Sequence, residues 1–240
     1  MKLFRLLVLG IIFFALTSVA DARTVRKFRW SGETWTVRHT YGFSNPGHNI
    51  FSDSDRSVWV DSKRRLVLKI RNGRAVEIYG PRRNYGTFTW NVDTSLTNLD
   101  LWRVIGLFAW APDGNEQDIE FARWGVPASP IGWSVGWANG TRANFTNFNV
   151  TSYAPYTVRL TVDMQSVHYS VIDARGTTLA DVSYAVPFQV TVSNFGFQPR
   201  MNYWLWPGVR GVRLPKQHRY GFHPIVRLNS FRYTPMVKTR

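Results

Sequence analysis

Cysteine is absent from all 240 residues, so the chain folds without disulfides and cannot carry a lipid anchor on an N-terminal cysteine. Most secreted eukaryotic domains use disulfides. Together with the export signal described next, this absence indicates a bacterial or archaeal source. Residues 23–240 must be held together by their core alone, and this length is sufficient for one large single domain.

Long apolar runs are also scarce. One run, from Leu6 to Leu16, follows a basic N-terminus. It is shorter than the roughly 20 residues of a membrane-spanning helix, and Ala20-Asp21-Ala22 provides a small-x-small cleavage site. We therefore expect residues 1–22 to be a secretory signal peptide. The mature protein would start near Arg23 and be soluble outside the cytoplasm, either extracellular or periplasmic. The alternative is an uncleaved N-terminal anchor.

Sustained helical periodicity is missing as well. From Phe28 onward, short stretches rich in β-branched and aromatic residues alternate with turn residues. One of them, Leu66 to Arg71, is followed by Asn72-Gly73, which predicts a tight hairpin turn. Many strands at short spacing predict an all-β fold, an antiparallel β-sandwich of the jelly-roll type. The Pro- and Arg-rich segment from Pro207 to Pro224 is expected to be a long surface loop.

Several motifs of other protein classes are not found. Phosphate loops and dinucleotide fingerprints are absent. The sequence from Gly132 to Gly136 spells G-x-S-x-G, but it lies in a strand-like run and no helix follows, as a nucleophile elbow would require. No metal site is predicted, because short metal-ligand spacing is missing among the five histidines, which are His39, His48, His168, His218 and His223.

Glutamate is rare, and two of the four glutamates lie in the segment from Glu116 to Glu120. On a β-strand, Glu116, Asp118 and Glu120 share one face, whereas Ile119 and Phe121 point the other way into a core. Three like charges in a row repel one another and destabilise a strand. We interpret the segment as a carboxylate-based active site, in preference to a solvated strand face.

Glycoside hydrolysis is the chemistry that most needs two carboxyl groups on one surface, one as nucleophile or base and the other as acid. Flexible side chains can bring two such carboxyl groups to the roughly 5–5.5 Å separation of a retaining enzyme. Crowding separates the pKa values, so that one group is ionised and another protonated near neutral pH, and the cluster titrates as a coupled set.

The E-x-D-x-E segment, with Ile119 after the aspartate and Phe121 after the second glutamate, resembles the motif of glycoside hydrolase family 16, the group of β-glucanases and xyloglucan transglycosylases. Other segments are similar to strands of that family, namely Tyr85–Phe88, Phe108–Trp110, Tyr156–Leu160, His168–Val171, Met201–Trp204 and Val226–Tyr233. Gln117 departs from the pattern, because the family usually carries an aliphatic residue there, and a buried glutamine needs hydrogen-bond partners.

The resemblance implies a concanavalin A-like jelly roll over residues 23–240 and a retaining, endo-acting hydrolase of β-linked glucan-type polysaccharide. Glu116 would be the nucleophile, Glu120 the acid/base, and Asp118 would support the nucleophile. No cofactor is implied, and a structural calcium ion, as some relatives carry, stays open. A transglycosylase on the same fold is an alternative, because only the acceptor of the glycosyl group differs.

Aromatic and amide side chains near the motif are candidates for binding the sugar. Aromatic rings stack on the apolar C–H faces of sugars, although tryptophan is also a common core residue. Trp204 lies in a segment similar to the Asn-Leu-Trp strand of the family and is expected to stack on a sugar. Trp124 has the strand parity of the three carboxylates, Asn202 is the expected polar contact, and Trp110 completes the set.

A second class of function is a carbohydrate-binding, lectin-like module without turnover, although the intact carboxylates favour an enzyme. The formal net charge of +15 would fit nucleic-acid binding, but export and a carboxylate-centred cleft argue against it. Association with an anionic envelope, a capsule or an acidic polysaccharide, and solubility at acidic pH, are the interpretations that stay open. We expect a monomer.

Overall fold

The computed structural model describes residues 24–127, 131–138, 141–185, 196–206 and 225–236, and the structural statements below concern these ranges. The expected signal peptide, residues 1–22, and the expected loop from Pro207 to Pro224 lie outside them. Within the described ranges, no helix is both long enough and apolar enough to cross a membrane.

The described residues form two antiparallel sheets. The first has the order β1-β2-β5-β14-β7-β8-β9-β10, with β1 (Lys27–Trp30), β2 (Glu33–Val37), β5 (Val76–Tyr79), β14 (Gln198–Leu205), β7 (Arg103–Trp110), β8 (Glu116–Ala122), β9 (Gly132–Ala138) and β10 (Thr141–Phe148). The second has the order β13-β12-β11-β6-β15-β4-β3, with β13 (Thr178–Ala185), β12 (Ser166–Ile172), β11 (Tyr156–Val162), β6 (Gly86–Val92), β15 (Val226–Pro235), β4 (Leu66–Leu68) and β3 (Val58–Val60).

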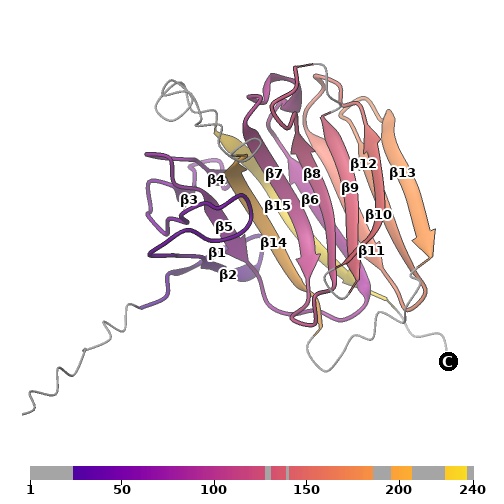
Figure 1. The fold of residues 1–240 in the computed structure, drawn as a ribbon, viewed down its shortest axis with the longest axis horizontal. Coiled ribbons are helices and arrows are strands. Elements are labelled where there is room, and N and C mark those ends of the chain that lie inside the picture. Colours follow the sequence, from indigo (N-terminus) through magenta and orange to yellow (C-terminus); the bar gives the residue numbers. More distant parts are fainter. Residues whose placement is uncertain (1–23, 128–130, 139–140, 186–195, 207–224, 237–240) are drawn as a thin grey trace, which may run out of the picture.

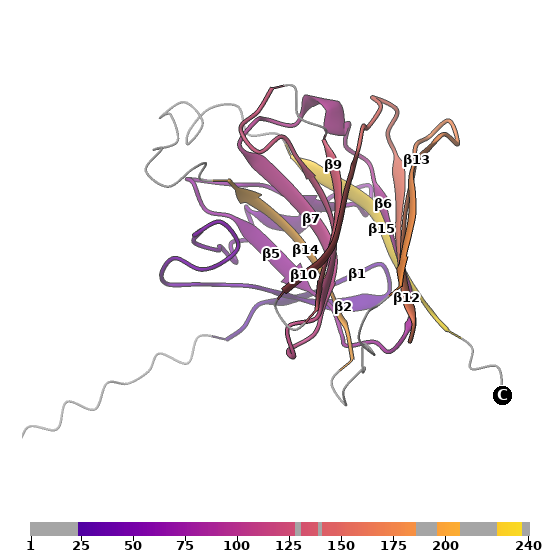
Figure 2. The ribbon, with the colours of Figure 1, turned by 45° about the vertical axis from the view of Figure 1, so that its right-hand side comes forward.

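The two sheets lie face to face (Figures 1 and 2), and one short 3₁₀ helix, Leu96–Asn98, precedes β7. The predicted all-β jelly-roll sandwich is thereby confirmed. Along each strand, successive side chains alternate between the space between the two sheets and an outer face.

The core between the sheets follows from this alternation. On β6, every second residue is buried, including Phe88 and Trp90. On β8, the buried residues Ile119 and Phe121 face the second sheet, as their position in the motif predicted. Burying a side chain of this size contributes about 1.5–3 kcal/mol. A core built from many such residues explains how a chain without disulfides can fold.

Gln117 finds its partner in the opposite sheet. The side chain is 3% exposed and points into the core, where the Tyr169 hydroxyl of β12 donates a 2.7 Å hydrogen bond to Gln117 Oε1. The tyrosine therefore provides the hydrogen-bond partner that a buried glutamine needs.

The Asn72-Gly73 turn forms as predicted, but the strands beside it do not form a hairpin. Both residues have positive φ, 52° and 69°, and Arg71 and Arg74 pair across the turn. However, β4 before the turn belongs to the second sheet and β5 after it to the first. The turn therefore carries the chain from one sheet to the other.

Candidate active site

The strand register places the motif in the middle of the first sheet. Glu116, Asp118 and Glu120 of β8 lie opposite Trp110, Phe108 and Gly106 of β7, respectively. Strand β14 pairs with the other edge of β7 and places Gln198, Arg200 and Asn202 in the same three rows. These side chains lie on the face of the sheet that points away from the second sheet, since the intervening residues of β7 and β8 belong to the core.

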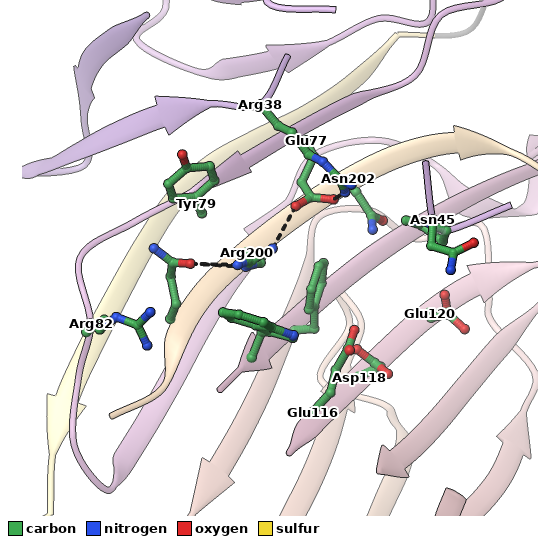
Figure 3. Close-up of a pocket in the computed structure, with 14 residues that line it drawn as sticks. Arg38, Asn45, Glu77, Tyr79, Arg82, Glu116, Asp118, Glu120, Arg200 and Asn202 are labelled. Atoms are coloured by element: carbon green, nitrogen blue, oxygen red, sulfur yellow. Dashed lines mark hydrogen bonds and ion pairs between the residues drawn. The ribbon is translucent and has the colours of Figure 1, made fainter. Parts of the chain in front are cut away.

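A cleft with a volume of about 710 Å³ lies over these rows. Figure 3 shows the three carboxylates following one strand and an arginine–glutamate group across from them. The lining residues are Arg38, Asn45, Pro46, Glu77, Tyr79, Arg82, Phe108, Trp110, Glu116, Asp118, Glu120, Gln198, Arg200 and Asn202. The structure therefore brings together Glu116, Asp118, Glu120, Trp110 and Asn202 of the expected site.

The two glutamates have different electrostatic surroundings. Burial raises the pKa of Glu120 to about 8, and the charge of Glu116 adds to the increase. Burial also raises the pKa of Glu116 and the charge of Glu77 adds to it, but a hydrogen bond with Asp118 and the charge of Arg200 limit the rise. Because only Glu116 has interactions that favour its ionised form, Glu116 loses its proton first.

An ion-pair network around one buried glutamate forms the opposite wall of the cleft. Glu77 is 1% exposed and lies between Arg38 Nη1 at 2.8 Å and Arg200 Nη1 at 3.0 Å. Arg200 also donates hydrogen bonds from Nε and Nη2 to Gln198 Oε1, and its guanidinium lies 4.0 Å from the centre of the Trp110 ring. A buried carboxylate is costly unless paired, and here two arginines pair it.

Sequence reasoning missed this network. Glu77 is one of only four glutamates and stands between apolar residues on a strand, which is the pattern of a buried charge in need of a partner. That signal was available, but the identity of the partners was not. Arg38 lies 39 residues and Arg200 lies 123 residues from Glu77 in the sequence.

Asn202 is fixed beside the row of Glu120. Its Oδ1 accepts a 2.9 Å hydrogen bond from the backbone N–H of Gly106, which is the residue opposite Glu120 on the neighbouring strand. A Cβ atom at position 106 would lie 2.5 Å from that same oxygen. Because glycine has no Cβ atom, the Asn202 amide can lie against the backbone of β7 at residue 106.

The structure corrects the expectation for Trp204. The side chain is 3% exposed and packs with Phe51 and Val104 in a second small core cluster, and it does not line the cleft. A neighbouring loop covers the ring, since a Cβ atom on Gly47 would overlap it. Trp204 therefore cannot present a ring face to a sugar in this structure.

Trp124 joins the same aromatic group. It lies beyond the end of β8, half-buried, with ring centroids 6.0 Å from Trp204 and 5.0 Å from Trp206, and 6.2 Å from Trp133. Trp133 lies in the row of Glu120. Trp124 thus lies on the side of the sheet that its parity predicted, but outside the residues that line the cleft. Its expected contact with sugar remains a prediction.

The sequence matches no protein-family model and no curated protein, but solved structures share its fold. A family 16 glycosyl hydrolase from Mycobacterium smegmatis has a TM-score of 0.61 at 15% identity, over 83% of this chain and 91% of that one. A prokaryotic β-1,3-1,4-glucanase (lichenase) derived from a mouse hindgut metagenome has a TM-score of 0.63 at 13% identity, over 87% and 96%. An immunostimulatory antigen and pseudo β-1,3-glucanase of Mycobacterium tuberculosis has a TM-score of 0.60 at 19% identity, over 85% and 91%.

Likeness at such low identity establishes the fold and not the activity. The chain has the jelly-roll fold of family 16 glycosyl hydrolases and β-glucanases, as the resemblance of its motif implied.

Proposed function

We propose that the protein is a retaining, endo-acting glycoside hydrolase for a β-linked, glucan-type polysaccharide. The observation that carries the proposal is the unequal environment of two glutamates in one cleft, with the pKa of Glu120 raised to about 8 and an ion-pair network across from them. An acid and a nucleophile of this kind are what glycoside hydrolysis with retention requires.

In the proposed reaction, protonated Glu120 donates its proton to the glycosidic oxygen while ionised Glu116 attacks the anomeric carbon. The sugar becomes covalently attached to Glu116, and the released oligosaccharide leaves with the proton. Glu120, now ionised, then takes a proton from a water molecule that attacks the same carbon and frees Glu116. Asp118, hydrogen-bonded to Glu116, favours the ionised form of the nucleophile. The reaction uses carboxyl groups of this chain and no cofactor.

Release of reducing sugars from a panel of polysaccharides tests the proposal. We expect turnover on at least one β-glucan, products that initially retain the anomeric configuration, and loss of turnover in Glu116→Gln. Exposed Arg159 of β11 lies in the other sheet, so Arg159→Gln is the matched control and should keep full activity. Wild-type turnover by Glu116→Gln, or products that start with inverted configuration, would contradict the mechanism.

A non-catalytic carbohydrate-binding protein is the second candidate, and one observation favours it. A solved structure with this fold is that of a pseudo β-1,3-glucanase. Binding of a polysaccharide without release of reducing ends, by wild type and Glu116→Gln alike, would establish this alternative. A transglycosylase would instead transfer the glycosyl group to an added oligosaccharide acceptor, with longer products as the readout. In each case we propose a monomer that acts outside the cytoplasm.

A further inference from the structure

We propose that the polysaccharide that enters this cleft is anionic, and that Arg82 and Arg200 bind its carboxylate or sulfate groups near the Glu116 end of the site. This inference rests on the proposed function, because it concerns the substrate of the same cleft. It commits to a charged glycan, whereas the proposed hydrolysis of a glucan-type chain requires no charge on the sugar.

Two arginines from separate segments meet around one ring at this end of the cleft. The guanidinium of Arg200, on β14, lies 4.0 Å from the centre of the Trp110 ring, and that of Arg82, which follows β5, lies 6.0 Å from it. Trp110 is opposite Glu116 in the strand register. Figure 3 shows Arg82 and Arg200 on the side of the cleft across from the carboxylates.

The acidic and basic groups of the cleft are separated in space. One wall holds Arg38, Arg82 and Arg200 and a single carboxylate, that of Glu77. Glu77 is shared between Arg38 and Arg200, and Arg82 is the third arginine on this wall. The carboxylates of the motif lie on the other wall. A ligand with negative charge on one side and a glycosidic bond near Glu116 and Glu120 would complement this arrangement.

The type of residue supports an anionic ligand more than a neutral one. Guanidinium groups present a planar fork of donors that matches carboxylate and sulfate oxygens, so an anionic group can accept two parallel hydrogen bonds from one arginine, which adds both energy and geometric specificity. Arg82 is exposed at the mouth of the cleft, where its long side chain can reach a substituent on the sugar ring. A formal net charge of +15 on the whole chain also attracts a polyanion over longer distances.

The test compares three ligands of the same backbone and length: a β-1,3-glucan oligosaccharide, its carboxymethylated form and its sulfated form. Binding is measured by calorimetry at low and at physiological salt, for wild type, Arg82→Gln and Arg159→Gln. We expect wild type to prefer at least one anionic form, and Arg82→Gln to lose about tenfold in affinity for it while its affinity for the neutral glucan is unchanged. The form preferred, carboxymethylated or sulfated, identifies the anion.

Arg159→Gln removes an equal charge from the opposite sheet and should bind all three ligands as wild type does. Equal affinity of wild type for neutral and charged glucans would overturn the inference. So would equal losses in Arg82→Gln and Arg159→Gln, because they would mean unspecific attraction. Turnover is measured in parallel on the same ligands. If the protein prefers an anionic ligand but turns over none of them, the proposed hydrolysis is refuted and the inference stands. If it turns over a ligand but does not prefer the anionic forms, the inference is refuted and the proposed hydrolysis stands.

Discussion

Glu120 is the residue whose protonation state decides the proposed chemistry. A general acid contributes about 10²- to 10⁴-fold to rate, so Glu120→Gln should lose activity on polysaccharide by about that factor. The loss should be much smaller on an activated aryl glycoside, whose leaving group departs without protonation. Rates of both variants, Glu116→Gln and Glu120→Gln, on both substrates check this. Equal losses for Glu120→Gln on the two substrates would contradict the role of Glu120 as the acid.

Asp118→Asn should keep measurable activity, because Asp118 only favours the ionised form of its neighbour Glu116.

The pH dependence of activity follows from the same pair. Activity requires ionised Glu116 and protonated Glu120, so kcat/KM should rise with pH as Glu116 loses its proton, above the usual glutamate pKa of 4.5. It should fall near pH 8, where Glu120 loses its proton. A bell-shaped profile from initial rates checks the prediction, and a plateau extending well above pH 9 would contradict it.

The stability of the folded protein should also depend on pH, because Glu120 binds its proton more tightly in the folded state. The pKa of Glu120 is higher in the folded protein than the ordinary value of 4.5, so the folded state binds more protons than the unfolded chain between these two pKa values. Stability therefore decreases as pH rises from about 4.5 to 8. Glu120→Gln should flatten this part of the curve in denaturant titrations.

At the scale of elements, the contact between β7 and β14 fixes the side chain of Asn202, which we propose contacts the sugar. Gly106→Ala would place a Cβ atom against Asn202 Oδ1 and break its bond to the backbone of residue 106. We expect a loss of about 1–3 kcal/mol in stability and weaker polysaccharide binding. Gly42→Ala is the control, because a Cβ atom there meets nothing within 4 Å. Thermal melts and binding of both variants check this, and an unchanged Gly106→Ala would contradict it.

Trp204 provides a second test of how β14 packs. Because the ring is buried, Trp204→Ala should lower the stability by about 3–5 kcal/mol. The comparison variant is Trp110→Ala, whose ring is half-buried and lines the cleft. It should destabilise less and weaken sugar binding more. Chemical denaturation measures the stability of both variants. A Trp204→Ala variant of unchanged stability but weaker sugar binding would contradict the buried position of Trp204 and support sugar stacking by its ring.

Local features of these elements could be predicted from the sequence, whereas contacts between distant segments could not. The face shared by Glu116 and Glu120 was predictable because alternation along one strand is local. The same holds for the Asn72-Gly73 turn, but not for the two sheets that it joins, since strand pairing is non-local. The burial of Trp204 depends on a loop distant in sequence, at Gly47. The partners of Glu77 likewise come from distant segments, Arg38 just after β2 and Arg200 on β14, so no local pattern identifies them.

At the scale of the whole molecule, two features bear on the proposed action outside the cytoplasm: the chain has no cysteine, and its formal net charge is +15. A fold held by its core alone does not depend on an oxidising compartment to form. The positive net charge favours contact with anionic polymers, and high salt screens this electrostatic attraction. Both properties are compatible with action in the periplasm or outside the cell, and the N-terminal sequence is the feature that would direct the protein there.

We therefore expect cleavage after Ala22 during export. The mass and N-terminal sequence of protein recovered from the periplasm or medium should correspond to a chain that starts near Arg23. Replacing Ala20 and Ala22 by large residues should leave the precursor uncleaved, because the peptidase requires small side chains at these positions. A variant lacking residues 1–22 should remain in the cytoplasm with the melting temperature of the exported protein, since the described fold begins only with β1 at Lys27. An intact Met1 on active protein in the membrane fraction would contradict the prediction.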